Sequence, residues 1–563
     1  MKTARFTLLM VVMVFGGFAV PGSDVVRANQ TPERKLAIYE LEPKTGLSLA
    51  DAERVSRLIN LVPAEGRGLD SAGTALKGSA VFRDKSGKAR LIFREDTGSV
   101  ELLPELSEAR EHAMPSQDAV RLAQQWLRQN GLWRLEDEQL RAGEVTILTR
   151  QEITPKGKAG EPLDAVRTVH LIRELDGLRV FGPTSGLTVD VGEKEVLGVF
   201  LSLRPLVKGR RIPTEVISQE EAREEFERRF SSEMHQWSRS NPEYRAQLAS
   251  MDQVYYEQGL RFIQPVYRFM IHVTNSHGAV GDYIRLLPAS RQPPELIPSR
   301  VRPAQAFPLS PKGSDLHKEA AGGPDPINYG MYVVRNDSTD WVDDAWEFHE
   351  GFDSGNFFGR FFFGVPPTQM TQYYWNYQWL WEAGGGQPDL SQYFVGEVNF
   401  AIIEGHGLPW WISTSGNCCD VIDLPKIAGY GGFNGKNGQT DYIVWKSCSV
   451  IPAPGDPYGT DYQSPATPFD VWWTIFQGLR GTYGFRTEMW IDDDISQGFA
   501  FNIGLGAANL ASWFHATDNC KWDHSSSMEY GSAVLVSGHE GDRAYDSAAL
   551  PRPGSLTIWW QHP

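Results

Sequence analysis

Two short apolar runs, "NFAIIEGHG" (399–407) and "YIVWKSC" (442–448), constrain the fold of this chain more than any other feature. Neither run alternates between apolar and polar residues, so each predicts a strand that is buried on both faces. Strands of this kind belong to parallel sheets that carry helices on both sides. The first run stops at His406 and the second at Cys448, so both predicted strands end on residues that can do chemistry.

Functional groups in open parallel sheets collect beyond the carboxyl ends of the strands. If the two strands are neighbours, the imidazole of His406 and the thiol of Cys448 emerge at the same edge of the sheet. Gly405 and Gly407 flank the histidine, and glycine lets another backbone approach closely. The sequence therefore predicts a Cys/His pair at this edge.

In the rest of the C-terminal part, residues 327–563, predicted strands alternate with predicted helices. This alternation predicts an α/β fold with a mostly parallel sheet. Further strands are expected at 328–337, 480–488 and 532–540. Helices are expected at 343–352, 370–384, 468–479 and 501–517.

This arrangement resembles the caspase–gingipain–legumain superfamily of cysteine peptidases, over about residues 326–550. Its members carry an apolar block that ends in His-Gly and a later apolar block that ends in a small or polar residue followed by Cys. The resemblance implies a caspase-like fold in which Cys448 is the nucleophile. It also implies that His406 is the general acid and base, and that the backbone N–H groups of Gly407 and Cys448 form an oxyanion hole. The implied partner is a protein or peptide substrate.

The first part of the chain has a different organisation. Residues 1–28 have the positive start, short apolar core and small-residue end of a secretory signal peptide, which predicts export to the periplasm or the medium. An N-terminal extension is expected at 29–109. In residues 110–290, a segment with a helical pattern is followed by segments with a strand pattern, and this order occurs twice. It predicts two small α+β modules.

The stretch "LDGLRVFGPTSGLTVDVGEKEVLGVFLSL" (175–203) resembles the PepSY-like and thermolysin-propeptide-like modules of secreted bacterial proteases. The resemblance implies an intramolecular pro-region, although an accessory α+β domain without an inhibitory role explains the same text. Residues 291–326 are rich in proline, which predicts an extended linker between the pro-region-like part and the α/β domain.

The formal net charge of −16 excludes nucleic acid as an expected partner, because the surface repels phosphates. Residues 326–563 hold 10 Lys+Arg against 27 Asp+Glu, and 15 of the 18 tryptophans. After the signal peptide no apolar run is long enough to predict stable insertion into a membrane.

Four cysteines in a chain of this length do not form a disulfide framework. With Cys448 as a nucleophile, a bridge from Cys418 or Cys419 to Cys520 is the simplest arrangement; a bridge that includes Cys448 is the alternative. No cofactor is expected. Asp492, Asp493 and Asp494 are weak candidate calcium ligands, and a solvated acidic turn is the favoured interpretation.

These patterns favour a secreted cysteine endopeptidase, made as a zymogen that is activated by cleavage in the linker. The alternative is a non-catalytic secreted protein on a peptidase-derived scaffold that binds peptide, glycan or cell wall. In that case the cluster of tryptophans forms a binding surface instead of core and cleft wall.

Overall fold

The computed structural model describes residues 36–563 apart from 65–78, 134–139, 156–158, 183–184, 241–244, 258, 276–277, 296–324, 335–338, 376–390, 392–393, 415–420, 428, 432–437, 457–469, 491–493, 521–527 and 547–549. The predicted signal peptide and nearly all of the predicted linker therefore lie outside the described residues. Among the residues described, no helix is both long and apolar enough to cross a membrane.

Four of the five strands expected in the C-terminal part lie in one parallel ladder, and these strands together with the helices confirm the mixed α/β class. Each strand in this ladder is paired in parallel with the next. Their order is β16 (Thr368–Trp375), β15 (Ile327–Val333), β17 (Phe400–Glu404), β21 (Tyr442–Lys446) and β22 (Gly481–Phe485). Beyond β22 the pairing becomes antiparallel through β23 (Gly531–Val536) and β24 (Leu556–His562).

The ladder continues into the N-terminal part of the chain. Strand β24 pairs with β6 (Leu140–Ile153), from Leu556↔Ile153 to His562↔Ile147. From β6 the order runs through β7 (Leu163–Leu175), β9 (Gly186–Val191), β10 (Val196–Leu201), β5 (Ser99–Leu102), β4 (Ala89–Arg94), β3 (Ala80–Arg83) and β2 (Val62–Pro63). Strands on the two sides of the proline-rich segment therefore share one hydrogen-bonded ladder.

Between residues 110 and 290 a helix followed by antiparallel strands occurs twice, which is the order of elements expected from the sequence. Helix α2 (Ser116–Gln129) precedes β6 and its neighbours. Helix α3 (Gln219–Ser240) precedes β12 (Arg245–Glu257), β13 (Phe262–Asn275) and β14 (Gly278–Pro288), which pair antiparallel. The Ser218 backbone N–H donates to Glu221 at 2.8 Å, and the Glu221 N–H donates back to Ser218 Oγ at 3.1 Å, so a capping box starts α3.

The remaining N-terminal elements complete these units. Helix α1 (Leu49–Leu58) lies beside β4, and β8 (Leu178–Phe181) pairs in parallel with β12. Strand β1 (Ala37–Leu41) pairs with β11 (Leu206–Pro213) and with β13.

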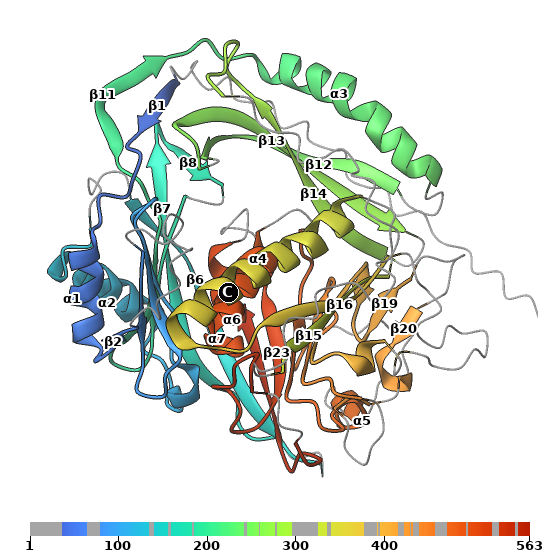
Figure 1. Ribbon diagram of the computed structural model, residues 1–563. Helices are drawn as coiled ribbons and strands as arrows, with labels where there is room; N and C mark the ends of the chain where they lie inside the picture. Colours follow the sequence, from blue (N-terminus) through green and yellow to red (C-terminus); the bar gives the residue numbers. More distant parts are fainter. Residues whose placement is uncertain are drawn as a thin grey trace, which may run out of the picture. The chain divides into compact units, whose positions relative to one another are not determined.

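Helices cover both faces of the parallel strands. One face packs against α4 (Thr339–Phe363), α6 (Ile495–Leu505) and α7 (Asn509–Asn519) in a core that includes Phe348, Phe400 and Phe499. The other face packs against α5 (Asp470–Ile475) and the 3-10 turn η6 (Leu424–Lys426). Figure 1 shows α4 in yellow beside α6 and α7 in red.

The contact between α4 and α6 requires glycine. A Cβ placed on Gly355 would lie 2.1 Å from the carbonyl oxygen of Phe501. No side chain fits at that distance, so the two helix backbones pack directly against each other.

Two differences from the sequence expectation concern single elements. The predicted helix over 370–384 is wrong where it can be compared, because residues Thr368–Trp375 form strand β16. Aromatic residues are also favoured in strands, and this run follows Pro366-Pro367, which holds the chain extended. The single helix expected at 501–517 is two helices, because Gly506 adopts φ +100° and ends α6.

A buried polar cluster joins α7 to the N-terminal strands. His515 Nε2 lies 3.0 Å from Glu101 Oε1, and Asn502 Nδ2 donates to the same oxygen at 2.7 Å. Burial lowers the pKa of His515, but the carboxylates of Glu101, Asp190 and Asp518 outweigh burial and leave the pKa raised. Burial raises the pKa of Glu101, yet His515 outweighs burial and brings it down to about 2.

This pair predicts a pH-dependent stability. Because the folded-state pKa of His515 is raised, its contribution is present below about pH 6.5 and is lost as the pH rises through the raised pKa. The contribution of Glu101 is lost only as the pH falls toward 2. We expect His515→Gln to lower the free energy of unfolding by about 3–5 kcal/mol at pH 6. The difference from the parent protein should be smaller at pH 8, measured by urea unfolding at both values. An equal difference at the two pH values would contradict a charged His515.

Candidate active site

Strands β17 and β21 bring His406 and Cys448 to matching positions of the sheet. The last register pair of the two parallel strands is Glu404↔Lys446. His406 follows Glu404 by two residues, and Cys448 follows Lys446 by two. Each residue of the predicted catalytic pair therefore stands two residues beyond the last register pair, on neighbouring segments of the chain.

The two chains stay together past the ends of the strands. The backbone N–H of Gly405 donates to the Lys446 carbonyl at 3.4 Å, and Ser447 Oγ donates to the Gly405 carbonyl at 2.7 Å. A Cβ on Gly407 would lie 2.2 Å from Ser447 Oγ and 2.6 Å from the carbonyl oxygen of Cys448. The segments that carry the imidazole and the thiol are thus in direct backbone contact.

Both side chains lie on the face of the sheet that α4 covers. Successive residues of a strand point to opposite faces. Ile402 and Val444 pack in the core beneath α4, and Cys448 belongs to the same core. The ring of His406 meets the ring of Trp341, on α4, with centroids 5.1 Å apart and planes at 90°. The imidazole and the thiol therefore share one face and one neighbouring helix.

The surroundings of the pair are dry and fixed. His406 and Cys448 are each 5% exposed. The carbonyl of His406 accepts a bond from the N–H of Ser413 at 2.7 Å. Ser449 adopts φ +53°, and its N–H donates to the carbonyl of Thr487 at 2.9 Å. Backbone hydrogen bonds thus hold the segments after both strands.

A small sheet continues from the histidine segment. It consists of β18 (Gly407–Leu408), β19 (Trp411–Ser413) and β20 (Val421–Asp423), paired antiparallel. Gly407, one of the two predicted oxyanion-hole residues, is the first residue of β18 and is paired with Ile412.

A layer of buried charges lies directly before the pair. Glu404 and Lys446 are 0% exposed, and Lys446 Nζ is 3.3 Å from Asp344 Oδ2 on α4. Tyr373 of β16 faces the same layer: burial raises the pKa of its hydroxyl, and the carboxylates of Glu404 and Asp343 raise it further. The charged layer and the Cys/His pair occupy the same face of β17 and β21.

The disulfide prediction extends beyond the described residues. Cys520, which follows the last residue of α7, is half-buried, and within the described part of the chain it forms no disulfide with Cys448. Cys418 and Cys419 lie outside the described residues. The bridge from one of them to Cys520 stays a prediction.

The candidate calcium ligands also lie partly outside the described residues. Asp492 and Asp493 lie outside the described residues, whereas Asp494 is the residue that precedes helix α6. Within the described part of the chain, no three His, Cys, Asp or Glu side chains are grouped as a metal site. Because two of the three candidate ligands lie outside the described residues, the calcium site stays a prediction.

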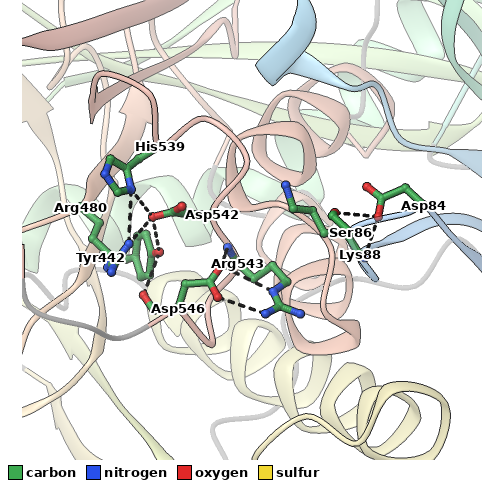
Figure 2. A network of polar contacts seen from close by, with 9 residues as sticks. All are labelled: Asp84, Ser86, Lys88, Tyr442, Arg480, His539, Asp542, Arg543 and Asp546. Carbon is green, nitrogen blue, oxygen red and sulfur yellow. Dashed lines mark hydrogen bonds and ion pairs between the residues drawn. The ribbon is translucent and has the colours of Figure 1, made fainter.

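A second polar network lies at the opposite end of the parallel strands (Figure 2). Tyr442 begins β21, and its hydroxyl donates to Asp542 at 3.5 Å and to the carbonyl of Asp546 at 3.3 Å. His539 Nδ1 lies 2.9 Å from Asp542 Oδ2, and Arg480 forms an ion pair with the same carboxylate. This network ties loops together at the amino ends of the strands.

The comparisons with known proteins leave the family open. No protein-family model matches the chain, and no curated protein matches it at a significant level. An uncharacterized protein from Eubacterium rectale is similar at 10% identity, with 47% of this chain and 86% of that one covered and a TM-score of 0.29. The C-terminal domain of Bacillus megaterium YpeB is similar at 13% identity, with 44% and 95% covered and a TM-score of 0.21. Both TM-scores are too low to carry an argument.

Sequence reasoning missed three side chains of the site: Trp341, Asp344 and Lys446. A lysine inside the apolar run "YIVWK" was a signal, because lysine is almost never fully buried without a partner. The contact of Trp341 with the imidazole had no signal, since the rotation of α4 about its axis is set by packing.

Proposed function

We propose that this chain is an exported cysteine endopeptidase that hydrolyses peptide bonds with Cys448 and His406. The observation that carries the proposal is that His406 and Cys448 each stand two residues beyond the last register pair of neighbouring parallel strands, on the side of the sheet that α4 covers. A thiol and an imidazole arranged in this way supply a nucleophile and a proton carrier. Export rests on the signal-peptide pattern of residues 1–28.

In the proposed reaction, the sulfur of Cys448 attacks the carbonyl carbon of the scissile peptide bond. His406 gives a proton to the leaving amine, and an acyl-enzyme results. Water, which loses a proton to His406, then releases the acid. The N–H groups of Gly407 and Cys448 are the proposed donors to the oxyanion, and the adjacency of their backbones supports this role.

The zymogen part of the proposal draws support from burial. With both residues 5% exposed, a substrate reaches them only after a rearrangement. The N-terminal strands touch the neighbourhood of the site, because Val254 of β12 and Ile284 of β14 pack in one cluster with Trp490. Trp490 follows closely on Thr487, whose carbonyl holds the segment after Cys448. The N-terminal part is therefore proposed as an intramolecular pro-region, and cleavage between 291 and 326 as the activating event.

One observation favours a second function, a non-catalytic binding protein on the same scaffold. The ring of His406 packs edge-on against Trp341 in a buried setting, which also suits a purely structural histidine. The two proposals differ in whether the thiol of Cys448 is activated.

Alkylation separates them. We treat the protein with an iodoacetamide probe before and after cleavage of the linker, under reducing conditions, and follow the Cys448 peptide by mass spectrometry. We expect His406→Ala to slow labelling of Cys448 at pH 7 by at least about tenfold, because the imidazole stabilises the reactive thiolate. Cys520 is the internal reference and should label at an unchanged rate. If Cys448 of the cleaved protein reacts no faster than Cys520, and the variant changes nothing, the binding-protein proposal is favoured.

A further inference from the structure

The two buried charged residues of the layer, Glu404 and Lys446, are spaced along β17 and β21 in the same way as His406 and Cys448 after them. Along β17, Glu404 precedes His406 by two residues, so both side chains lie on one face. Along β21, Lys446 precedes Cys448 by two residues on the same face. Because Glu404↔Lys446 is a register pair, an acidic residue stands two positions before the histidine and a basic residue two positions before the cysteine, at the same level of the sheet.

We infer that Lys446 is a positioning residue that holds Cys448 as a thiolate beside a charged His406, with Glu404 as its counterpart two positions before the histidine. The inference rests on the proposed Cys/His function and names the groups that tune it. In the step concerned, the proton leaves Cys448 Sγ for the solvent, while the imidazole keeps its own proton. The negative charge that forms on the sulfur is opposite in sign to the Lys446 ammonium and has the same sign as the Glu404 carboxylate.

The charges around the pair are mostly negative, so the positive charge of Lys446 decides whether the Cys448 thiolate is stabilised. The neighbouring groups on this face include the carboxylates of Asp343 and Asp344 on α4, the hydroxyl of Tyr373 on β16, and Glu404 itself. Carboxylates favour a charged imidazole and disfavour a thiolate. Lys446 is the cation that offsets them, and its ammonium is held by Asp344 at 3.3 Å and lies 5.6 Å from the ring centroid of Phe485.

Burial gives this arrangement its strength. Lys446 and Glu404 are 0% exposed, so water does not screen them. The Cα atoms of residues two apart on a strand are separated by about 6.6–6.8 Å, and we take this as the scale of the separation between the ammonium and the thiol. At the effective dielectric of protein interiors, one buried charge at this distance shifts the pKa of a thiol by about one to two units.

The test is the pH at which Cys448 reaches half of its maximal alkylation rate, in the full chain after linker cleavage. Iodoacetamide is the probe, and the Cys448 peptide is followed by mass spectrometry with Cys520 as the reference. We expect Lys446→Met to raise the midpoint by about one to two units, which is about a 10- to 100-fold slower reaction at a fixed pH below it. Lys446→Arg keeps the charge and should restore most of the parent midpoint. Glu404→Gln should move the midpoint the other way.

The opposite directions of the two midpoint shifts distinguish an electrostatic effect from a loss of packing. A loosened site would shift the midpoint of Lys446→Met and of Glu404→Gln in the same direction. Midpoints that move in the same direction, or do not move, overturn the inference. If Lys446→Met does not fold, Glu404→Gln and Lys446→Arg decide: an unchanged midpoint in Glu404→Gln, or a raised one in Lys446→Arg, overturns it. Failure of the proposed function looks different, since the labelling of Cys448 would then be independent of His406 in the parent protein.

Discussion

Ending the chain after Gly554, so that β24 is deleted, is expected to abolish folding of the whole protein. Strand β24 lies between β23 and β6 and is hydrogen-bonded to both. Four of its apolar side chains are buried, with Leu556, Ile558 and Trp559 at 0% exposure and Trp560 at 6%. At about 1.5–3 kcal/mol each, their burial contributes about 6–12 kcal/mol. The net stability of a folded domain is itself about 5–15 kcal/mol, so this loss is decisive.

The deletion also exposes two strand edges, on β23 and on β6, and unpaired edges promote aggregation. We expect insoluble protein, or soluble protein without a cooperative thermal transition by circular dichroism. Deleting Pro563 alone is the matched control, because it shortens the chain without removing a residue of β24. A truncated protein that melts cooperatively near the parent temperature would show that the two parts of the ladder are independent.

The role of β24 illustrates what the sequence did not reveal. The segment "LTIWWQH" is short and lies at the end of the printed chain, and its partner β6 is some four hundred residues away. Periodicity reports whether a segment is extended but not which distant strand it joins. The continuity between the N-terminal strands and the α/β part could therefore be found only in three dimensions.

The candidate site was more accessible to sequence reasoning. The runs around Ile402 and Val444 are apolar on both faces, so their burial and parallel pairing could be predicted. The equal distance of His406 and Cys448 from the last apolar pair placed them at one edge. The error at Thr368–Trp375 has the opposite origin, because a run of aromatic residues suits either a helix or a strand. The pairing of β16 with β15 decided between the two.

What the sequence left out is the environment of the pair. Asp344 and Trp341 reach the site from α4, and a helix presents them only after its axial rotation is fixed by packing, such as the glycine contact at Gly355. The chemistry of the proposed site thus has two origins. Strand register aligns His406 with Cys448, and helix packing supplies the charges that surround them.

The second large effect is expected at Gly407, where the two segments of the site meet. A methyl group there would lie 2.2 Å from Ser447 Oγ and 2.6 Å from the carbonyl oxygen of Cys448. Ser447 is 0% exposed and bonded to the Gly405 carbonyl, so it has no space to move into. In Gly407→Ala the backbone at Cys448 must therefore shift.

A displacement of about 1 Å at reacting groups costs about 100-fold in rate. We expect Gly407→Ala to reduce both peptide hydrolysis and the His406-dependent alkylation of Cys448 by about this factor. The cost in global stability should be only about 1–3 kcal/mol, as for other overpacked sites. Measuring the alkylation rate alongside urea unfolding separates a local displacement from general unfolding.

Two further variants make the test specific. At Gly405 an added Cβ meets its nearest neighbours at 3.1 Å, so Gly405→Ala should cost distinctly less reactivity than Gly407→Ala. Replacing Ser447 by glycine in the Gly407→Ala background removes the 2.2 Å contact and leaves the one at 2.6 Å, so it should restore part of the rate. Full reactivity in Gly407→Ala would mean that the backbones of the two segments are farther apart than a shared active site allows, and the proposed peptidase mechanism would lose its geometric basis.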